Sequence, residues 1–338
     1  MADNTKIEWT DRTWNPVTGC TKVSPGCDHC YAETVAHRFA GSKAFPNGFD
    51  VTLHEDRVNQ PYRWKKPARV FVNSMSDLFH QDVPDLVLNH VFDVMEANPQ
   101  HTFQVLTKRH ARMRNFVQQR EALRREYAAK FDDCPTEAMR NSPAAKAARA
   151  RAATAPANIW LGVSVENQKW ADIRIPALLE TPAAVRFLSC EPLLGPIWFA
   201  DYASQPCGCC LGETHGEACS DCADSGCDGG HIQALHWVIA GGESGRGARA
   251  MHPNWACSLR DQCEQERVSF FFKQWGAFAP DSPEYERGTI SFIDAGDGCT
   301  CSKPDANAPQ DAARMRRVGK QTAGRLLDGR THDAIPAP

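Results

Sequence analysis

Six short apolar runs, most of them ending in polar residues, constrain the fold of this 338-residue chain more than any other feature. They lack a strict alternation of apolar and polar residues, which is typical of strands covered on both faces, as in a parallel sheet. Helical patterns lie between them, at 83–99, 167–180 and 254–267. This alternation predicts an α/β fold, either a partial or full (β/α) barrel of parallel strands or a doubly wound sheet. The runs span residues 68–77, 101–109, 158–167, 184–192, 235–244 and 268–276.

Two segments interrupt the alternation of strands and helices. Residues 117–157 are rich in Ala and Arg, which predicts a helical, partly disordered insertion with little core. Residues 200–234 are rich in Gly and Cys and nearly without large apolar residues, so we expect a metal-binding insertion there. The barrel would then consist of residues 1–116, 158–199 and 235–338.

Polar residues follow five of the runs at the point where each predicted strand ends. In barrels and open α/β sheets this edge carries the active site, so these residues are candidates for binding and catalysis. Each has a structural alternative, namely helix capping, hydrogen bonding in the core or a buried ion pair. The candidates are Asn73, Ser74, Asp77, Lys108, Ser164, Glu166, Glu191, Gly241, Gly242 and Glu243.

Three cysteines, Cys20, Cys27 and Cys30, lie within eleven residues with the spacing C-x6-C-x2-C. A closed tetrahedral zinc site needs four ligands, and His29 is poorly placed to be the fourth because it adjoins Cys30. A catalytic zinc with three ligands normally includes His or carboxylate groups. A [4Fe–4S] cluster held by three cysteines, with one iron open to a substrate or cosubstrate, accounts for the number of thiols.

A second set of cysteines lies in the Gly- and Cys-rich segment. Thiolates in a segment that cannot bury a core predict a structural zinc, with an auxiliary iron–sulfur cluster or no metal as alternatives. Cys299 and Cys301 are positioned in the sequence to complete either site. The proposed ligands are Cys210, Cys219, Cys222 and Cys227, with Cys207 and Cys209 close by.

The composition argues against several classes of protein. No run of about 18 apolar residues is present, so we expect no membrane association and a soluble protein of the cytoplasm. Fifteen cysteines in a chain of this length favour metal ligation over a disulfide scaffold, which is typically small and secreted. A net charge of −3 lacks the basic footprint of a nucleic-acid-binding domain, although basic strips occur at 63–66, 108–114 and 314–320.

The cysteine segment resembles the cluster loop of radical S-adenosylmethionine (SAM) enzymes, whose usual spacing is C-x3-C-x2-C with an aromatic residue before the last cysteine. Here six residues separate Cys20 from Cys27, and His29 takes the place of the aromatic residue. A narrower family, a phage and bacterial three-cysteine-motif family described as radical-SAM-like, is similar over residues 6–195, 235–277 and 319–330. The segments that carry this resemblance are "IEWTDRTWNPVTGCTKVSPGCDHCYAE", "FVNSMSDLFH", "FQVLTKR", "FLSCEPLLGPI", "WVIAGGESGRGARAMHP", "FFFKQWG" and "GKQTAGRLLDGR".

The resemblance implies a [4Fe–4S] cluster, SAM as cosubstrate, and a 5′-deoxyadenosyl radical that abstracts hydrogen from the substrate, with a flavodoxin- or ferredoxin-type reductant as partner. By position, Asn73, Ser74 and Asp77 would contact the amino group of SAM, and Ser164 and Glu166 its ribose. Gly241, Gly242 and Glu243 would bind its adenine or carboxylate. Lys108 and Glu191 would contact the substrate or transfer protons.

The phage context of this family implies that the substrate is a nucleotide or a DNA base. If the protein is phage-encoded, it would act in the cytoplasm of the host. The expected reaction is a phage DNA hypermodification step, such as isomerisation or C–C bond formation on a modified thymidine. A radical lyase that repairs DNA lesions is the first alternative. An extrahelical base needs a pocket with a basic rim, which residues 63–66 and 108–114 would supply.

Two non-radical classes remain open from the residues alone. A non-catalytic zinc protein that binds nucleic acid would explain the second cysteine cluster and the basic strips. A thiol-redox sensor would use Cys27 and Cys30 as its C-x2-C pair, but Cys20 would then have no role.

Overall fold

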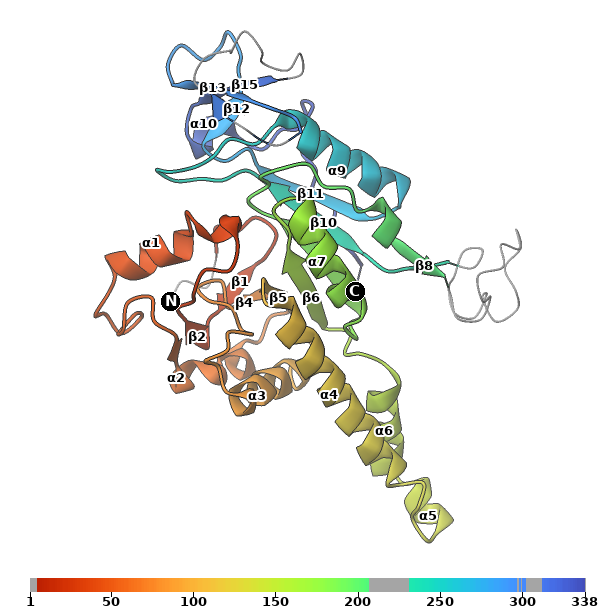
Figure 1. The fold of residues 1–338 in the computed structure, drawn as a ribbon. Coiled ribbons are helices and arrows are strands. Elements are labelled where there is room, and N and C mark those ends of the chain that lie inside the picture. Colours follow the sequence, from red (N-terminus) through yellow and green to blue (C-terminus); the bar gives the residue numbers. More distant parts are fainter. Residues whose placement is uncertain (1–4, 207–230, 297, 299, 302–311, 338) are drawn as a thin grey trace.

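Seven parallel strands form the central sheet, which curls into a half-barrel (Figure 1). The computed structural model describes residues 5–206, 231–296, 298, 300–301 and 312–337. The sheet has the order β1-β4-β5-β6-β7-β10-β11, so its strands follow one another in chain order. This is the arrangement of a partial (β/α) barrel. The strands are β1 (Arg12–Trp14), β4 (Arg69–Val72), β5 (Thr102–Thr107), β6 (Ile159–Ser164), β7 (Val185–Cys190), β10 (Trp237–Gly241) and β11 (Ser269–Gln274).

All six predicted strands are present, and the three predicted helical segments form α3 (Asp85–Glu96), α7 (Gln168–Leu179) and α9 (Pro253–Gln265). The strand β1 was not predicted, because it has three residues and therefore carries almost no periodic signal. A four-stranded antiparallel sheet near the C-terminus, in the order β12-β15-β13-β14, was not predicted either. Its strands are β12 (Phe278–Pro280), β13 (Ile290–Ile293), β14 (Thr300–Cys301) and β15 (Ala313–Arg317).

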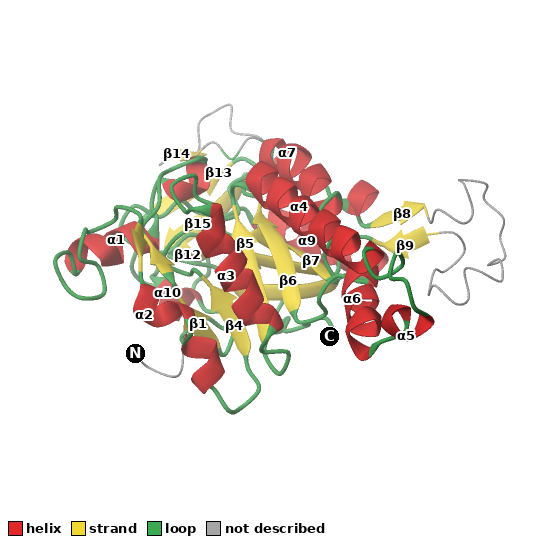
Figure 2. Cartoon of the chain, turned by 90° about the horizontal axis from the view of Figure 1, so that it is seen from below, coloured by secondary structure: helices red, strands yellow, loops and turns green. Residues whose placement is uncertain are grey.

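The outer face of the curled sheet packs against α3, α4 (His110–Ala129), α7 and α9 (Figure 2). Side chains alternate between the two faces of a strand, so Val70 and Val72 join the helices while Phe71 points to the concave side. This two-sided burial explains why the sequence shows continuous apolar runs.

Trp237 is the centre of a second, aromatic core on the concave face. Its ring centroid lies 6.0 Å from that of Trp9, 6.1 Å from Trp160 and 5.7 Å from Phe187. Its indole N–H donates to the carbonyl of Ala334 over 2.9 Å. The concave face is therefore filled near the amino ends of the strands by aromatic side chains and the buried Gln104, and further polar residues lie near the carboxyl ends.

The helix α4 continues past residue 117, where the sequence placed the start of an insertion, and pairs with α6 (Pro143–Ala153). Together with α5 (Glu137–Arg140) these helices extend away from the sheet (Figure 1). No helix in the described ranges is both long and apolar enough to cross a bilayer.

Short elements complete the described fold. Two pairs of antiparallel strands lie outside the large sheets, β2 with β3 and β8 with β9. The remaining elements are β2 (Val17–Thr18), β3 (Thr52–Leu53), β8 (Ser204–Pro206), β9 (His231–Gln233), α1 (Tyr31–Arg38), α2 (Glu55–Val58), α10 (Lys320–Ala323), and the 3-10 helices η1 (Pro25–Cys27), η2 (Gln60–Arg63) and η3 (Ala200–Tyr202).

Candidate active site

Residues 19–30, here called the cysteine loop, connect β2 to α1 and contain all three cysteines of the first cluster. The loop begins at Gly19, whose φ of 85° suits glycine and whose N–H donates to the carbonyl of Met75 over 3.0 Å. A Cβ at Gly19 would lie 2.2 Å from the carbonyl oxygen of Asp50. The entry to the loop is therefore fixed beside the residues that follow β4.

Arg109 links the loop to the residues that follow β5. Its guanidinium donates to the hydroxyl of Thr21 over 2.7 Å and to the Thr21 carbonyl over 3.2 Å. The same hydroxyl lies 2.8 Å from Nε2 of His80. Burial lowers the pKa of His80, and the charge of Arg109 lowers it further, so the ring is neutral near pH 7.

Glu166, two residues beyond β6, binds the middle of the loop. Its Oε1 accepts a hydrogen bond from the Ser24 hydroxyl over 2.5 Å, and its Oε2 accepts from Arg174 over 2.8 Å. The ammonium of Lys108 lies 3.8 Å from Oε1. Glu166 and Arg174 are fully buried, and Arg174 stacks on Trp170 at 4.1 Å. A Cβ at Gly26 would lie 2.5 Å from Oε1, so the loop backbone approaches this carboxylate closely.

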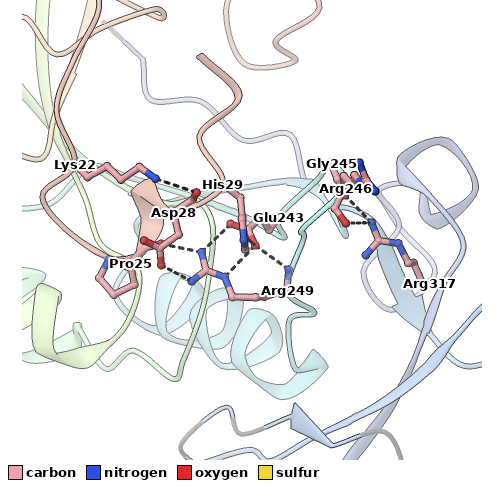
Figure 3. Close-up of polar contacts among 9 residues, drawn as sticks. All are labelled: Lys22, Pro25, Asp28, His29, Glu243, Gly245, Arg246, Arg249 and Arg317. Carbon is pink, nitrogen blue, oxygen red and sulfur yellow. Dashed lines mark hydrogen bonds and ion pairs between the residues drawn. The ribbon is translucent and has the colours of Figure 1, made fainter. Parts of the chain in front are cut away.

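Glu243, two residues beyond β10, holds the end of the loop through Arg249 (Figure 3). Arg249 donates to both carboxylate oxygens of Glu243, over 2.7 and 3.0 Å, and to the carbonyl of Pro25 over 2.8 Å. It also lies 3.3 Å from Asp28. Burial opposes ionisation of Glu243, but the hydrogen bonds from Arg249 and His29 lower its pKa below the ordinary value.

His29 is occupied by this arrangement. Its Nδ1 lies 3.1 Å from the Glu243 carboxylate, and a Cβ at Gly247 would lie 2.8 Å from its Nε2. One ring nitrogen is therefore directed at a carboxylate and the other faces a close backbone. His29 is thus held in place as a structural contact of the loop.

Glu191 and Lys273 form an ion pair of 3.0 Å at the carboxyl ends of β7 and β11. Gly241 of the intervening strand β10 lies beneath them, and a Cβ there would be 2.9 Å from Oε1 of Glu191. A Cβ at Gly242 would lie 2.0 Å from the carbonyl oxygen of Trp275. Both glycines are thus required by packing in this structure, one by an ion pair and one by a close backbone.

The polar side chains that follow β4 differ in whether they have hydrogen-bond partners among the described residues. Asp77 accepts hydrogen bonds from the Thr107 hydroxyl over 2.7 Å and from the N–H groups of Phe79 and Lys108, each over 3.0 Å, so its contacts are structural. Ser74 donates to Asn15 over 3.2 Å. Asn73 is buried with φ 59°, and neither polar atom of its side chain has a hydrogen-bond partner among the described residues.

Ser164, at the end of β6, is buried, and its carbonyl accepts a hydrogen bond from Arg174 over 2.6 Å.

The side chains of the basic strip at 108–114 contact other residues of the protein. Besides Lys108 and Arg109, Arg112 lies 2.5 Å from Asp85 and Arg114 lies 2.8 Å from Glu180. These contacts hold the strip against the fold.

The donor set of the cysteine loop matches three-cysteine ligation. Cys20, Cys27 and Cys30 are partly exposed and form no disulfide. Burial raises the pKa of Cys20 to about 11, with a further rise from Asp77 and an opposing effect of Arg109. In the described ranges no three or more His, Cys, Asp or Glu side chains are arranged to hold a metal ion, so the sulfurs are not already drawn together. Cys210, Cys219, Cys222 and Cys227 lie outside the described residues.

Four residues important to this site were missed in the sequence: Ser24, Arg174, Arg249 and Lys273. A lysine inside the apolar run "VSFFFKQWG" was a readable signal, because charged residues are rarely buried without a partner. The other three carry no such signal, since their partners are distant in the chain or lie on an ordinary helix.

A cavity of about 510 Å³ lies elsewhere, bordered by α9, β12 and the segment 322–328. Cys257, Trp275 and Tyr285 are among its lining residues, and it shares none with the cysteine loop or the strand-end candidates. Its volume is within the range of ligand pockets, but none of the candidate residues faces it.

Comparison with known proteins yields one family. A family model described as "Protein of unknown function (DUF5131)" matches residues 4–336. No curated protein matches the chain, and no solved structure does. Because the model covers nearly the whole sequence, including both the strands and the cysteine loop, the chain belongs to the DUF5131 family.

Proposed function

We propose that this protein is a radical SAM enzyme that acts on a nucleotide or DNA base at the carboxyl edge of the half-barrel. The observation that carries the proposal is the position of the cysteine loop. Contacts from the ends of β5, β6 and β10 hold three unpaired thiols over an edge that also presents polar side chains on the concave face. A parallel α/β sheet places its reactive groups at this edge.

The ligand count supports a cluster with one open iron. Three cysteines are available, and His29 is engaged by Glu243. A [4Fe–4S] cluster bound by Cys20, Cys27 and Cys30 would supply the electron that cleaves SAM into methionine and a 5′-deoxyadenosyl radical, after reduction by a flavodoxin- or ferredoxin-type donor.

The protein's own residues would orient the reactants and exclude water. Arg109, Glu166 and Arg249 would hold the loop rigid above the sheet. Both polar atoms of the buried Asn73 side chain lack a hydrogen-bond partner in the described part of the chain, so Asn73 would bind a polar group of SAM or of the substrate. The aromatic core around Trp237 closes the concave face below the strand ends.

Electron paramagnetic resonance of anaerobically purified, dithionite-reduced protein tests this proposal. We expect a [4Fe–4S]⁺ signal that changes when SAM is added, because the open iron binds the cosubstrate. Cys20→Ala, Cys27→Ala and Cys30→Ala should each abolish SAM cleavage while the far-UV circular dichroism remains that of the wild type. A protein that binds zinc alone after iron–sulfur reconstitution would contradict the proposal and favour a non-catalytic zinc protein.

The substrate is the second part of the proposal. Product analysis after incubation with SAM, reductant and phage-type modified DNA would distinguish hypermodification, such as isomerisation or C–C bond formation on a modified thymidine, from cleavage of a DNA lesion. A change in mass or connectivity of the modified base would support the former, and restoration of unmodified pyrimidines the latter.

A further inference from the structure

The ion pair between Glu191 and Lys273 is built across a strand that carries neither residue. The strand order at this end of the sheet is β7-β10-β11, so side chains from β7 and β11 must reach over β10 to meet. They meet above Gly241, where a Cβ would lie 2.9 Å from Oε1 of Glu191 and 3.5 Å from Cβ of Lys273. Glycine at this position is what allows the 3.0 Å contact.

A local irregularity in β11 directs Lys273 to this place. Ala240 pairs with Phe272, but Gly241 pairs with Gln274, so Lys273 has no partner on β10. Such bulges re-aim side chains and are frequent beside active sites. Phe271 belongs to the concave aromatic core, and alternation puts Lys273 on the same face, one layer nearer the carboxyl edge.

The pair is accessible, although not freely exposed. The side chains of Lys273 and Glu191 are 19% and 15% exposed. A partly open ion pair presents a cationic donor beside an anionic acceptor, with spare hydrogen-bonding capacity on both. A small anionic ligand would meet the repulsion of Glu191, and a cationic ligand that of Lys273. A neutral ligand with an acceptor next to a donor satisfies both groups together.

We propose that Glu191 and Lys273 form the binding site for the base of the substrate, with the hydrogen-bonding edge of a nucleobase on the ion pair. For a thymine ring, the Glu191 carboxylate accepts from the ring N3–H and the Lys273 ammonium donates to the adjacent carbonyl oxygen. This inference rests on the proposed function in one respect, namely that the substrate is a nucleotide or DNA base.

Binding measurements on the full chain, without reductant or SAM, test the site. Isothermal titration with thymidine 5′-monophosphate and with its N3-methyl derivative separates the two hydrogen bonds, because the methyl group removes the donor alone. We expect the N3-methyl nucleotide to bind the wild-type protein at least about tenfold more weakly than the parent nucleotide does. We expect a loss of the same size when the parent nucleotide binds Glu191→Ala or Lys273→Met. Single-stranded oligothymidylate, measured in parallel, distinguishes a free nucleotide from a base within DNA as the source.

The exchange variant Glu191→Lys/Lys273→Glu separates recognition from a merely structural ion pair. A structural role predicts that the exchange restores both stability and binding. Recognition predicts restored stability without restored binding, because the donor and acceptor have traded places. Lys130→Met, directly after α4, removes an exposed contact with Glu126; this variant serves as the matched control and should bind like the wild type.

Equal affinity for both thymidine nucleotides, or unchanged affinity in Glu191→Ala and Lys273→Met, would overturn the inference. Failure of the proposed function looks different. If SAM is not cleaved but the discrimination at N3 holds, the base site stands and the radical chemistry fails. If SAM is cleaved and no nucleotide is discriminated, the radical chemistry stands and the base site fails.

Discussion

The hydroxyl of Ser24 donates to Glu166 over 2.5 Å, although 142 residues separate the two in the chain. The contact joins the cysteine loop to a fully buried ion pair between Glu166 and Arg174. A buried carboxylate needs partners on all sides, because an unpaired charge in the protein interior is costly. The loop therefore completes the environment of Glu166, and Glu166 fixes the middle of the loop.

Replacing one member of this buried pair should destabilise the protein strongly. Glu166→Ala leaves Arg174 buried without its anion, and we expect a loss of about 3–5 kcal/mol in the free energy of unfolding. Urea unfolding followed by tryptophan fluorescence measures this. The double variant Glu166→Leu/Arg174→Met removes both charges and should be the more stable of the two. If Glu166→Ala had the stability of the wild type, the ion pair would not be buried in solution.

Arg249 should control how firmly the cysteine loop is held. Arg249→Met removes hydrogen bonds to Glu243 and to the carbonyl of Pro25. Hydrogen bonds to charged groups contribute about 1.5–3 kcal/mol each, so tryptic cleavage after Lys22 should accelerate by about tenfold or more.

The matched control for Arg249 is Arg317→Met. Arg317 also donates to backbone carbonyls, those of Gly245 and Arg246, but it does not contact the loop (Figure 3). Peptide mass spectrometry gives the cleavage rate at Lys22 in both variants. Equal acceleration in the two would mean that the effect is general loosening and not release of the loop.

Gly241→Ala should break the contact between Glu191 and Lys273. The added Cβ would lie 2.9 Å from Oε1 of Glu191, and the backbone at Gly241 is not in the left-handed region, so the cost is steric. We expect a loss of about 1–3 kcal/mol in unfolding free energy. In the double variant Gly241→Ala/Glu191→Ala the carboxylate that the new Cβ would approach is gone. A double-mutant cycle should therefore show a favourable coupling between the two substitutions. Strict additivity would argue against the predicted clash.

Acid should weaken the attachment of the loop through Glu243. Its folded pKa lies below the ordinary value of 4.5, so the folded state binds fewer protons than the unfolded state near that pH. The stabilisation is therefore present above pH 4.5 and is lost as the pH falls through the folded pKa. Urea midpoints measured at pH about 6 and about 3.5 should fall less in Glu243→Gln than in the wild type. An identical fall in both proteins would rule out a contribution from this carboxylate.

The sequence alone predicted the main architecture because that architecture depends on local patterns. Six apolar runs and the helical segments between them correspond to β4–β7, β10 and β11 and to their covering helices. The elements that it missed have weak local signals. The strand β1 has three residues, and the strands of the C-terminal antiparallel sheet have at most five.

The candidate residues at the strand ends were found for a general reason, since parallel strands expose polar residues at their carboxyl ends. The individual roles were less predictable. Asp77 and Glu166 form hydrogen bonds and an ion pair within the protein. Gly241 and Gly242 are required by packing. Lys273 was not among the candidates, because its position depends on a shift in the pairing of β10 and β11.

Local sequence encodes the alternation of strands and helices, the presence of three thiols in one loop, and the glycines on which close contacts depend. These follow from the chemistry of neighbouring residues. Tertiary structure alone decided that Ser24 meets Glu166, that Arg249 clamps the loop, and that Lys273 reaches Glu191 over Gly241. Such contacts join residues distant in the chain, and they depend on strand order, register and helix packing, which no local pattern encodes.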